Sequence, residues 1–409
     1  MQKKNISLDE AKKIIDANIA PIQRTEILKI KDLIKFNVFA DRVLATDVIS
    51  GINVPPFDKS AMDGYAVKFE DTQNASSENP VKLKLSGSVF AGQTGKNKTT
   101  LKEIKSGECI YVTTGSVLPV NANAVVMIEN TKREGNKVKI FKSPKLSENI
   151  GKEGEDIKKG NVLLRKGEIL TPAKIGVLTA IGVKETEVYS IPNVAIIGTG
   201  NEIIDVGKKL TPGKIYDINS YALAAVIKKA GCIPVRPKIA KDEEKILQKR
   251  LEEALQYDVV VISGGSSVGE KDLLSKVVES SGKILFHGVN IKPGKPTLFG
   301  NVNGKPVFGM PGNPASCLMN ACVFLLPALR KMARISFERK IVKAKISEKL
   351  RSNSDRHLFV TVKLENGCVK AVYKTSGAIT SMSGADGFIE IPITKQVIEK
   401  EEEVEVNLF

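Results

Sequence analysis

A chain of 409 residues is longer than one ordinary domain, because single hydrophobic cores stop growing at roughly 250 to 300 residues, so about three domains are expected. The composition is 42% hydrophobic and 26% charged, which is typical of globular chains and excludes collagen, coiled coil and wholesale disorder. Lysine and arginine number 62 against 46 aspartate and glutamate. The resulting net charge of +16 favours anions such as phosphates, oxyanions or nucleic acid.

Histidine and cysteine are scarce. A histidine general base or a histidine-rich zinc site would have to use His287 or His357, and neither lies in a recognisable motif. The five cysteines are scattered and form no C-x-x-C pair, so we expect them to be reduced and mostly buried in a cytoplasmic protein. No export signal is visible, and the longest apolar run, residues 321–329, is too short to span a bilayer.

The first elements follow from capping and periodicity. Ser7 and Glu10 form a capping box that predicts a helix to about residue 18. Residues 81–141 contain short alternating apolar pieces separated by Gly and Asn, which predicts a small β-rich unit. Thr171 and Pro172 then have the pattern of an N-cap and first residue of a helix.

Residues 192–334 predict an α/β domain, because apolar strand-like runs alternate with amphipathic segments. The expected strands are 194–197, 233–235, 259–262 and 284–286, and the expected helices are 220–229, 242–255, 272–280 and 315–331. Asn303-Gly304 predicts a hairpin within this domain. Beyond residue 337, strict alternation over 358–364 followed by a turn at Asn366-Gly367 predicts a small terminal β-barrel.

A turn rich in Gly and Ser follows the predicted strand at 259–262. Its backbone N–H groups and the Ser267 hydroxyl would attract a phosphate or an oxyanion, although a plain tight turn explains the same residues. The spacing of Gly264, Gly265 and Gly269 matches neither the dinucleotide fingerprint nor the Walker pattern, so neither site is predicted.

Two carboxylates follow predicted parallel strands. Glu202 and Asp272 would both point into the crevice where open α/β sheets bind ligands. Two carboxylates facing a phosphate indicate a bridging Mg²⁺, and the alternative is that one of them only caps a helix. Ile203 occupies the third glycine position of the dinucleotide fingerprint, which argues against NAD.

Two further segments carry charge in stiff surroundings. The turn from Lys292 to Pro296 holds Lys292 and Lys295 and suits a fixed anion, although solvated surface lysines are the alternative. Residues 311–314 precede the last predicted helix and would offer open N–H groups to an anion. The loop at 55–67, which contains Asp63, is either a tight turn or a functional lid.

In this order, the segments resemble the MoeA family of molybdopterin molybdenumtransferases, which has relatives in animals (gephyrin) and plants. The matching stretches run from residue 54 to 387 and are PPFDKSAMDGYAV, TTGSVLP, NANAVVMIEN, GEDIKKG, GTGNE, YDINSY, ISGGSSVGEKD, IKPGKP, GMPGNPASC and SGAITSMSGADGF. ISGGSSVGEKD and GMPGNPAS by themselves would indicate only the molybdopterin-binding domain that is shared with MogA adenylyltransferases.

The resemblance implies an α/β plus β multidomain fold in an elongated homodimer. The implied domains are a discontinuous N-terminal linker domain (1–55 and 149–189), a β-rich inserted domain (56–148), a central MogA-like α/β molybdopterin-binding domain (190–335) and a C-terminal small β-barrel (336–409). Each active-site cleft would combine the α/β domain of one subunit with the β-rich domain of the other.

The resemblance also implies an activity. Molybdate would be inserted into adenylylated molybdopterin with release of AMP, aided by Mg²⁺, in the cytoplasm. Contacts with the molybdopterin adenylyltransferase and with acceptor molybdoenzymes are further expectations, whereas no nucleic acid and no membrane partner is expected. The alternatives are a scaffold protein, of which gephyrin is an example, a nucleic-acid-binding protein, which +16 alone would favour, and an enzyme of the adenylylation step itself.

Carried over by motif, the expected catalytic residues are Asp63, Asp156, Glu202, Asp272 and Lys292. The expected substrate-binding residues are Thr114, Asp242, Gly264, Gly265, Ser267, Lys295, Pro311, Gly312, Asn313, Pro314 and Ser376. Glu202, Asp63 and Asp156 would position Mg²⁺, and Lys292 and Lys295 would hold the charge of molybdate or phosphate. Asp272, with Gly265 and Ser267, would line the pterin and phosphate pocket.

Three positions depart from the family pattern. Asn201 and Asn123 stand where the family commonly has aspartate, and Gly288 stands where some members have a basic residue. Asn201 removes a carboxylate beside Glu202, which weakens the expected metal site there, and Gly288 leaves more of the anion binding to Lys292.

Overall fold

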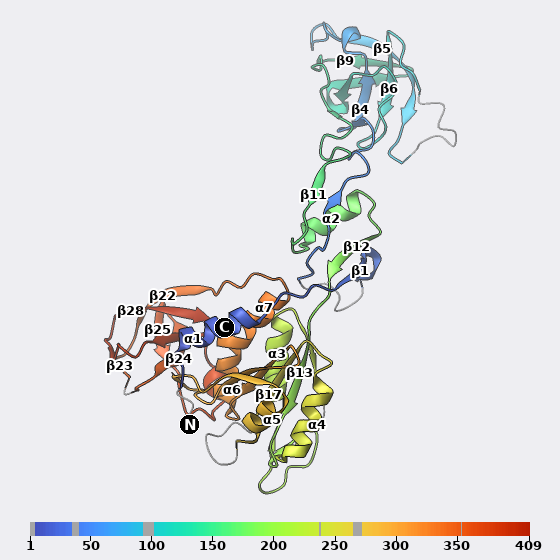
Figure 1. The fold of residues 1–409 in the computed structure, drawn as a ribbon. Helices are drawn as coiled ribbons and strands as arrows, with labels where there is room; N and C mark the ends of the chain where they lie inside the picture. Colours follow the sequence, from blue (N-terminus) through green and yellow to red (C-terminus); the bar gives the residue numbers. More distant parts are fainter. Residues whose placement is uncertain (1–4, 35–40, 93–101, 237–238, 265–271, 353) are drawn as a thin grey trace. The chain divides into compact units, whose positions relative to one another are not determined.

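The computed structural model describes residues 5–34, 41–92, 102–236, 239–264, 272–352 and 354–409, and Figure 1 traces the chain. The chain forms two compact units. The smaller unit comprises Leu28–Ile34 and Thr46–Thr186, and the larger unit comprises Met1–Ile27, Lys35–Ala45 and Glu187–Phe409. Strand β1 (Thr25–Lys29) pairs with β12 (Glu185–Tyr189) where the chain passes between the two units.

A six-stranded sheet forms the core of the smaller unit. Its order is β7-β4-β6-β5-β9-β8, and every pair is antiparallel except β5 with β6. Leu83 and Val138 are buried in its core, while the residues next to them along each strand are exposed or only partly buried. The β-rich prediction is confirmed. The strands are β4 (Gly64–Val67), β5 (Val81–Val89), β6 (Glu108–Val112), β7 (Ala124–Met127), β8 (Thr131–Glu134) and β9 (Lys137–Ile140).

Two antiparallel strand pairs and one α-helix also belong to the smaller unit. The pairs are β2 (Val48–Ile49) with β11 (Val162–Leu164) and β3 (Lys59–Ser60) with β10 (Ile150–Gly151). Helix α2 (Pro172–Ala180) begins after Thr171, whose hydroxyl accepts a hydrogen bond from the Lys174 N–H at 3.4 Å. The predicted N-cap and the proline at the first helical position are therefore confirmed.

The larger unit contains a second six-stranded sheet, in the order β16-β13-β17-β21-β20-β18. The first four strands are parallel and the last two are antiparallel to their neighbours, with β20 and β21 joined by the predicted Asn303-Gly304 hairpin. The strands are β13 (Asn193–Gly198), β16 (Ile233–Val235), β17 (Val259–Ser263), β18 (Lys283–His287), β20 (Leu298–Val302) and β21 (Lys305–Met310).

Helices cover both faces of this sheet (Figure 1). Helices α4 (Glu244–Ala254) and α5 (Leu273–Ser281) pack together over the fully buried Ala195, Val260 and Ile262. Helix α3 (Ile218–Lys229) packs against β13 and β16 and contacts the last helical segment. It begins two residues before the predicted start because Asp217 is the N-cap, and its carboxylate accepts a hydrogen bond from the Ser220 N–H at 2.9 Å.

The last helix of this domain was predicted as one continuous α-helix, and this expectation is wrong in its middle. Helix α6 (Pro314–Asn320) passes into a π-helical turn, η4 (Ala321–Leu325), before α7 (Leu326–Met332). Pro327 lies in the first turn of α7 and has no N–H to donate to the preceding turn, which explains why the regular ladder fails here. The Cys322 carbonyl in this segment accepts a hydrogen bond from Arg339 Nη2 at 2.7 Å.

This helical stretch, Pro314–Met332, is the one helix in the described residues that is long and apolar enough to cross a membrane. However, 78% of its apolar 18-residue window is buried inside the fold. Its apolar side chains therefore belong to the protein core.

The C-terminal residues form a closed β-barrel, as predicted. The order β24-β25-β22-β28-β26 is closed by pairing of β26 with β24, and β19 adds to β24 from outside this ring. The strands are β19 (Ile291–Lys292), β22 (Ile341–Ile346), β24 (His357–Glu365), β25 (Cys368–Ala371), β26 (Gly387–Ile391) and β28 (Glu403–Leu408). Smaller elements are β23 (Leu350–Arg351), β27 (Val397–Ile398) and α8 (Thr380–Ser383). The domain boundaries expected from the sequence stay predictions.

The N-terminal helix α1 (Leu8–Asn18) confirms the predicted capping at its start. The Ser7 side chain accepts a hydrogen bond from the Glu10 N–H at 3.1 Å. Leu8, Ala11 and Ile15 are buried, so one apolar face of the helix packs into the larger unit.

Candidate active site

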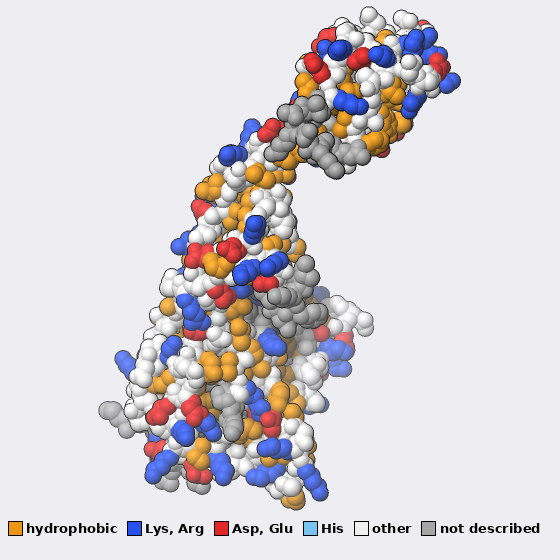
Figure 2. Space-filling view, turned by 90° about the vertical axis from the view of Figure 1, so that its right-hand side faces the viewer, with side chains coloured by type: hydrophobic (Ala, Val, Ile, Leu, Met, Phe, Trp, Pro, Cys, Tyr) orange, Lys and Arg blue, Asp and Glu red, His pale blue; other side chains and the backbone are white. Residues whose placement is uncertain are grey.

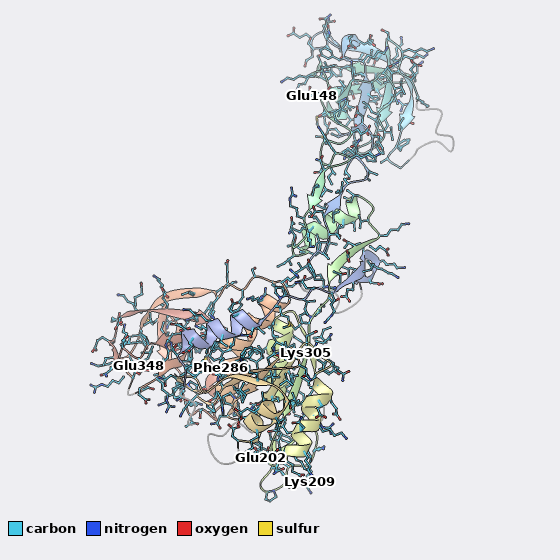
Figure 3. The ribbon with its side chains drawn as sticks, in the orientation of Figure 1. Glu148, Glu202, Lys209, Phe286, Lys305 and Glu348 are labelled. Carbon is cyan, nitrogen blue, oxygen red and sulfur yellow. The ribbon has the colours of Figure 1, made fainter. Side chains whose placement is uncertain are left out.

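A cavity of about 1020 Å³ opens at the carboxyl ends of the parallel strands in the larger unit. This is the position at which open α/β sheets bind ligands. Ten of the predicted site residues line it: Glu202, Asp242, Gly264, Lys292, Lys295, Pro311, Gly312, Asn313, Pro314 and Ser376. Gly265 and Ser267 lie outside the described residues. Figure 3 shows Glu202 at one end of the α/β domain, and the segment that carries Lys209 projects from the same end.

Close backbone contacts build the floor of the cavity. Gly264 has φ +102°, and a Cβ atom added there would lie 2.3 Å from the carbonyl oxygen of Thr199. Any side chain at position 264 would therefore push the ends of β13 and β17 apart. Asn219, on α3, bridges the same region, since its Nδ2 donates to Ser263 Oγ at 2.8 Å and to the Gly312 carbonyl at 2.7 Å.

The predicted residue Asp242 is held by the turn after β13. Its carboxylate accepts hydrogen bonds from Thr199 Oγ1 and from the Asn201 N–H, each at 3.3 Å. The Asp242 N–H in turn donates to Asn201 Oδ1 at 3.3 Å. An aspartate at position 201 could also accept this last bond, but it would add a second negative charge beside Asp242. The neutral amide of this chain avoids that repulsion.

Three cations lie around the cavity, two of them predicted. Lys292 is exposed and Lys295 is half-buried, and neither forms an ion pair in the described part of the chain. The third is Arg356, which the sequence analysis missed. Arg356 immediately precedes β24, and β24 pairs with β19 in the register Ile291 with His357. This pairing places Arg356 at the same cavity as Lys292, although the two residues are 64 positions apart in the sequence, and no local signal around Arg356 indicates it.

At the start of α6 one N–H group is engaged within the protein, and one position has no N–H group. Pro314 has no N–H, and the Ala315 N–H donates to the Ser376 carbonyl at 3.1 Å. The Asn313 side chain donates to Ser376 Oγ at 3.1 Å. These bonds attach the segment that contains Ser376 to the cavity wall, and the anion-binding role expected of residues 311–314 stays a prediction.

Asp272 caps a helix, which is the alternative that the sequence analysis left open. Its Oδ1 accepts a hydrogen bond from the Ser275 N–H at 3.1 Å at the start of α5, and its Oδ2 lies 3.3 Å from His287 Nε2. Both residues are largely buried, and Asp272 does not line the cavity as the described residues define it. The contact with His287 also escaped the sequence analysis, because the two residues lie on separate elements.

The remaining predicted residues belong to the smaller unit. Asp63 Oδ1 accepts hydrogen bonds from the Thr114 N–H at 2.6 Å and from Thr114 Oγ1 at 2.9 Å. The backbone bond and then the hydroxyl bond hold the pKa of Asp63 below its ordinary value, so its carboxylate is ionised at neutral pH. Asp156 is also exposed.

Three of the predicted segments of the smaller unit meet in space. The Ser60 N–H donates to the Ser116 carbonyl at 3.0 Å, and the Gly115 N–H donates to the Ser60 carbonyl at 2.8 Å. Asp58 accepts hydrogen bonds from the Glu153 N–H at 2.8 Å and from Lys152 Nζ at 2.9 Å. The loop at 55–67 is therefore an ordered loop joined to the segments around residues 114 and 154.

Two departures from the family pattern have local explanations. Asn123 Oδ1 accepts a hydrogen bond from the Phe69 N–H at 2.6 Å, and its Nδ2 donates to Glu70, so an amide satisfies both partners. Gly288 has φ +96°, and an added Cβ atom would lie 2.4 Å from Asn5 Oδ1. A basic side chain at position 288 is therefore incompatible with this packing.

The surface charge is not gathered into one stripe on the face drawn in Figure 2, where basic side chains are dispersed among acidic and neutral ones. The charges that are candidates for a function are those of Lys292, Lys295 and Arg356 at the cavity. In the described residues no group of three or more His, Cys, Asp or Glu side chains is arranged to hold a metal ion.

The fold and the cavity define an α/β ligand-binding domain joined to a β-barrel, and residues 195–331 match the family described as a probable molybdopterin binding domain. Residues 6–182 match the MoeA N-terminal region (domain I and II), and residues 343–409 match the MoeA C-terminal region (domain IV). The chain belongs to the MoeA family.

Individual relatives agree with this assignment along nearly the whole chain. A crystal structure of a molybdopterin biosynthesis MoeA protein from Pyrococcus horikoshii is 40% identical, with a TM-score of 0.84 over 99% of both chains. A putative molybdopterin biosynthesis protein of Methanocaldococcus jannaschii is 37% identical over 90% of both chains. A protein of Haemophilus influenzae named molybdopterin molybdenumtransferase is 36% identical over 80% of this chain and 78% of its own length.

Proposed function

We propose that the chain is a molybdopterin molybdenumtransferase of molybdenum cofactor biosynthesis, which inserts molybdate into adenylylated molybdopterin and releases AMP. The observation that supports this most is the cavity of about 1020 Å³ with Lys292, Lys295 and Arg356 around it, in a chain of the MoeA family. Its volume is large enough for a drug-sized or larger ligand, and its cations suit anions.

The chemistry requires two anions to meet. Molybdate and the pyrophosphate-linked nucleotide repel each other, and the bond to AMP can break only after molybdate has been brought close. Lys292, Lys295 and Arg356 would offset this repulsion and stabilise the charge that develops on the departing phosphate. The glycine-lined floor at Gly264 and Gly312 would admit the substrate close to the backbone.

Mg²⁺ remains part of the proposal. Magnesium prefers one or two carboxylates together with substrate phosphates, so the missing cluster of three protein ligands in the described residues does not conflict with it. The ionised Asp63 has one oxygen engaged by Thr114, and its Oδ2 has no hydrogen bond within the described residues. Asp63, Asp156 and Glu202 are the candidate carboxylates, of which one or two would bind the ion directly. When bound, it would neutralise charge on phosphate oxygens.

A homodimer follows from the same proposal. The cavity belongs to the larger unit, whereas Asp63, Thr114 and Asp156 belong to the smaller one. We propose that the smaller unit of one subunit supplies these residues to the cavity of the other subunit, and that the dimer acts in the cytoplasm. The adenylyltransferase that makes the substrate and the acceptor molybdoenzymes are its proposed protein partners.

The test is an assay of molybdate-dependent AMP release. Purified protein receives adenylylated molybdopterin, Mg²⁺ and molybdate, and both AMP and reconstitution of a molybdoenzyme are followed. The wild type should release AMP only when molybdate is present. AMP transfer from ATP to molybdopterin would instead indicate the adenylylation step, and neither activity would favour a scaffold.

Asp63→Ala should abolish most of this activity, and Asp71→Ala is its matched control. Asp71 lies in the same unit and also accepts one hydroxyl and one backbone bond, from Ser106 Oγ at 2.7 Å and from the Gly107 N–H at 2.8 Å. Equal activity in the two variants would contradict the role proposed for Asp63.

A further inference from the structure

The turn that carries Lys292 and Lys295 is held from behind by a buried amide. Asn320, at the end of α6, donates from Nδ2 to the Gly294 carbonyl at 2.9 Å and to Thr297 Oγ1. Thr297 Oγ1 donates in turn to the same Gly294 carbonyl at 2.7 Å. Asn320 and Thr297 are both completely buried. One backbone oxygen in the middle of the cationic turn therefore accepts two buried hydrogen bonds.

The backbone of the turn is shaped around this amide. Gly294 has φ +101°, and an added Cβ atom would lie 2.3 Å from Asn320 Oδ1 and 2.4 Å from Asn320 Nδ2. The amide therefore packs directly against the glycine, at a distance that no side chain allows. Its orientation is also determined, because the Gly294 carbonyl can only accept, so the NH₂ group must face it.

Each lysine is also held through its own backbone. The Lys295 carbonyl accepts hydrogen bonds from the Val289 N–H at 3.0 Å and from the Thr297 N–H at 2.8 Å. Lys292 lies in β19, which pairs with β24 of the barrel. Gly294 lies between these two anchored residues, and its carbonyl is the point that Asn320 and Thr297 secure. Asn320 itself does not line the cavity as the described residues define it.

We infer that Asn320 is a positioning residue for oxyanion binding. It acts through the Gly294 carbonyl by keeping the backbones of Lys292 and Lys295 at a constant separation, so that both ammonium groups can reach one tetrahedral anion. The inference rests on the proposed role of the two lysines in holding molybdate. Without this support, the distance between the backbones of Lys292 and Lys295 would vary. The turn would then have to be ordered before one anion could bind both ammonium groups, and this ordering costs binding free energy.

The test compares molybdate binding in the whole protein. Asn320→Ala removes both amide bonds, and Thr297→Val removes the hydroxyl but leaves the bond from Asn320 to Gly294. Leu247→Ala is the stability control, since Leu247 is buried in α4 within the same unit and lies outside the cavity. Direct binding is measured by equilibrium dialysis of molybdate with metal analysis, and each variant's melting temperature and kcat are recorded beside its KM values.

Asn320→Ala should weaken molybdate binding about tenfold, since misplacement of binding groups by 1 Å can have effects of about a hundredfold. Thr297→Val should weaken it less. The KM for molybdate should rise more than the KM for adenylylated molybdopterin, and Leu247→Ala should lower the melting temperature without changing molybdate binding. In a Lys292→Met/Lys295→Met background, Asn320→Ala should change molybdate binding by less than twofold, because the groups it positions are gone.

Three results would overturn the inference: unchanged molybdate binding in Asn320→Ala, an equal loss in the background without the two lysines, or an equal loss in Leu247→Ala. If Asn320→Ala does not fold, Thr297→Val is judged by the same comparisons. Failure of the proposed function gives a different pattern, in which Lys292→Met/Lys295→Met binds molybdate as tightly as the wild type.

Discussion

Replacing Lys295 with methionine is the most direct test of the cations at the cavity. The change keeps most of the length of the side chain and removes its charge. Lys295 is half-buried and Lys292 is exposed, and both line the cavity without an ion pair in the described residues. Because water screens an exposed charge more than a half-buried one, the loss of Lys295 should have the larger effect.

The magnitude follows from the environment of each charge. Two unit charges about 4 Å apart attract each other by about 4 kcal/mol at an effective dielectric constant of about 20, and by about 1 kcal/mol in bulk water. Lys295 lies between these limits, and the desolvation of its ammonium group offsets part of the attraction. We expect Lys295→Met to weaken the binding of molybdate by about 1.4 kcal/mol, which is about tenfold. Lys292→Met should weaken it by about 0.5 to 1 kcal/mol, or roughly two- to fivefold.

The assay is molybdate-dependent AMP release at about 0.05 M and about 0.3 M salt, because higher ionic strength shortens the reach of exposed charges. The KM for molybdate should rise in both variants, and the effect of Lys292→Met should shrink more at the higher salt concentration. Lys295→Arg keeps the charge and should retain most of the binding. Lys249→Met removes an exposed lysine of α4 outside the cavity and should change nothing.

A larger effect of Lys292→Met than of Lys295→Met would refute the argument from burial. An unchanged KM for molybdate in both variants would refute the assignment of these cations to the oxyanion. An equal loss in Lys249→Met would show that only the net charge of the protein matters.

Three further predictions concern stability and reactivity. Burial raises the pKa of Asp258, but hydrogen bonds from Arg24 (2.5 and 2.6 Å) and from the Asn193 N–H outweigh it and leave the pKa below its ordinary value. Asp258→Asn should therefore lower the free energy of unfolding by about 2 to 3 kcal/mol at pH 7. This deficit should fade as the pH drops below about 4 toward the lowered pKa of the folded state. A deficit that is independent of pH in denaturant titrations would contradict this reasoning. Thr361 is buried in β24, and its Oγ1 has no hydrogen-bond partner within the described residues. Thr361→Val should therefore raise the melting temperature and stabilise the fold by about 1 kcal/mol. A destabilised variant would imply a partner for this hydroxyl. Burial raises the pKa of the Cys317 thiol to about 12, whereas Cys368 is half-buried. A thiol reagent should therefore modify Cys368 first in the native protein, as measured by mass spectrometry. Early labelling of Cys317 would contradict its burial.

Local patterns in the sequence were sufficient for most of the elements. The capping residues Ser7 and Thr171 predicted the starts of α1 and α2, because an N-cap depends only on residues within one turn. The Asn303-Gly304 and Asn366-Gly367 turns predicted two hairpins for the same reason. The π-helical turn η4 was not predicted, although Pro327 is a local signal for an irregular helix, because the apolar run around it was interpreted as one continuous helix.

The sequence motifs predicted many residues of the candidate site, but they did not predict how these residues contact one another. Ten predicted residues do meet around one cavity. Some of them follow adjacent parallel strands, whose ends lie at one edge of the sheet, whereas Lys292, Lys295 and Ser376 reach the cavity from other segments. The roles of these residues stay predictions. Asp272 is engaged in capping α5 and in its contact with His287, and neither contact follows from its motif.

The sequence by itself determined the order of strands and helices, the glycine-rich turns and the presence of two lysines in one stiff turn, because these depend on neighbours along the chain. Only the tertiary structure placed Arg356 at the cavity and Asn320 behind the Gly294 carbonyl. Arg356 arrives through the pairing of β19 with β24, and Asn320 arrives through the packing of α6 beneath the turn. Such contacts join residues that are distant in sequence, and their energy exists only once the sheet, the barrel and the helix have been brought together.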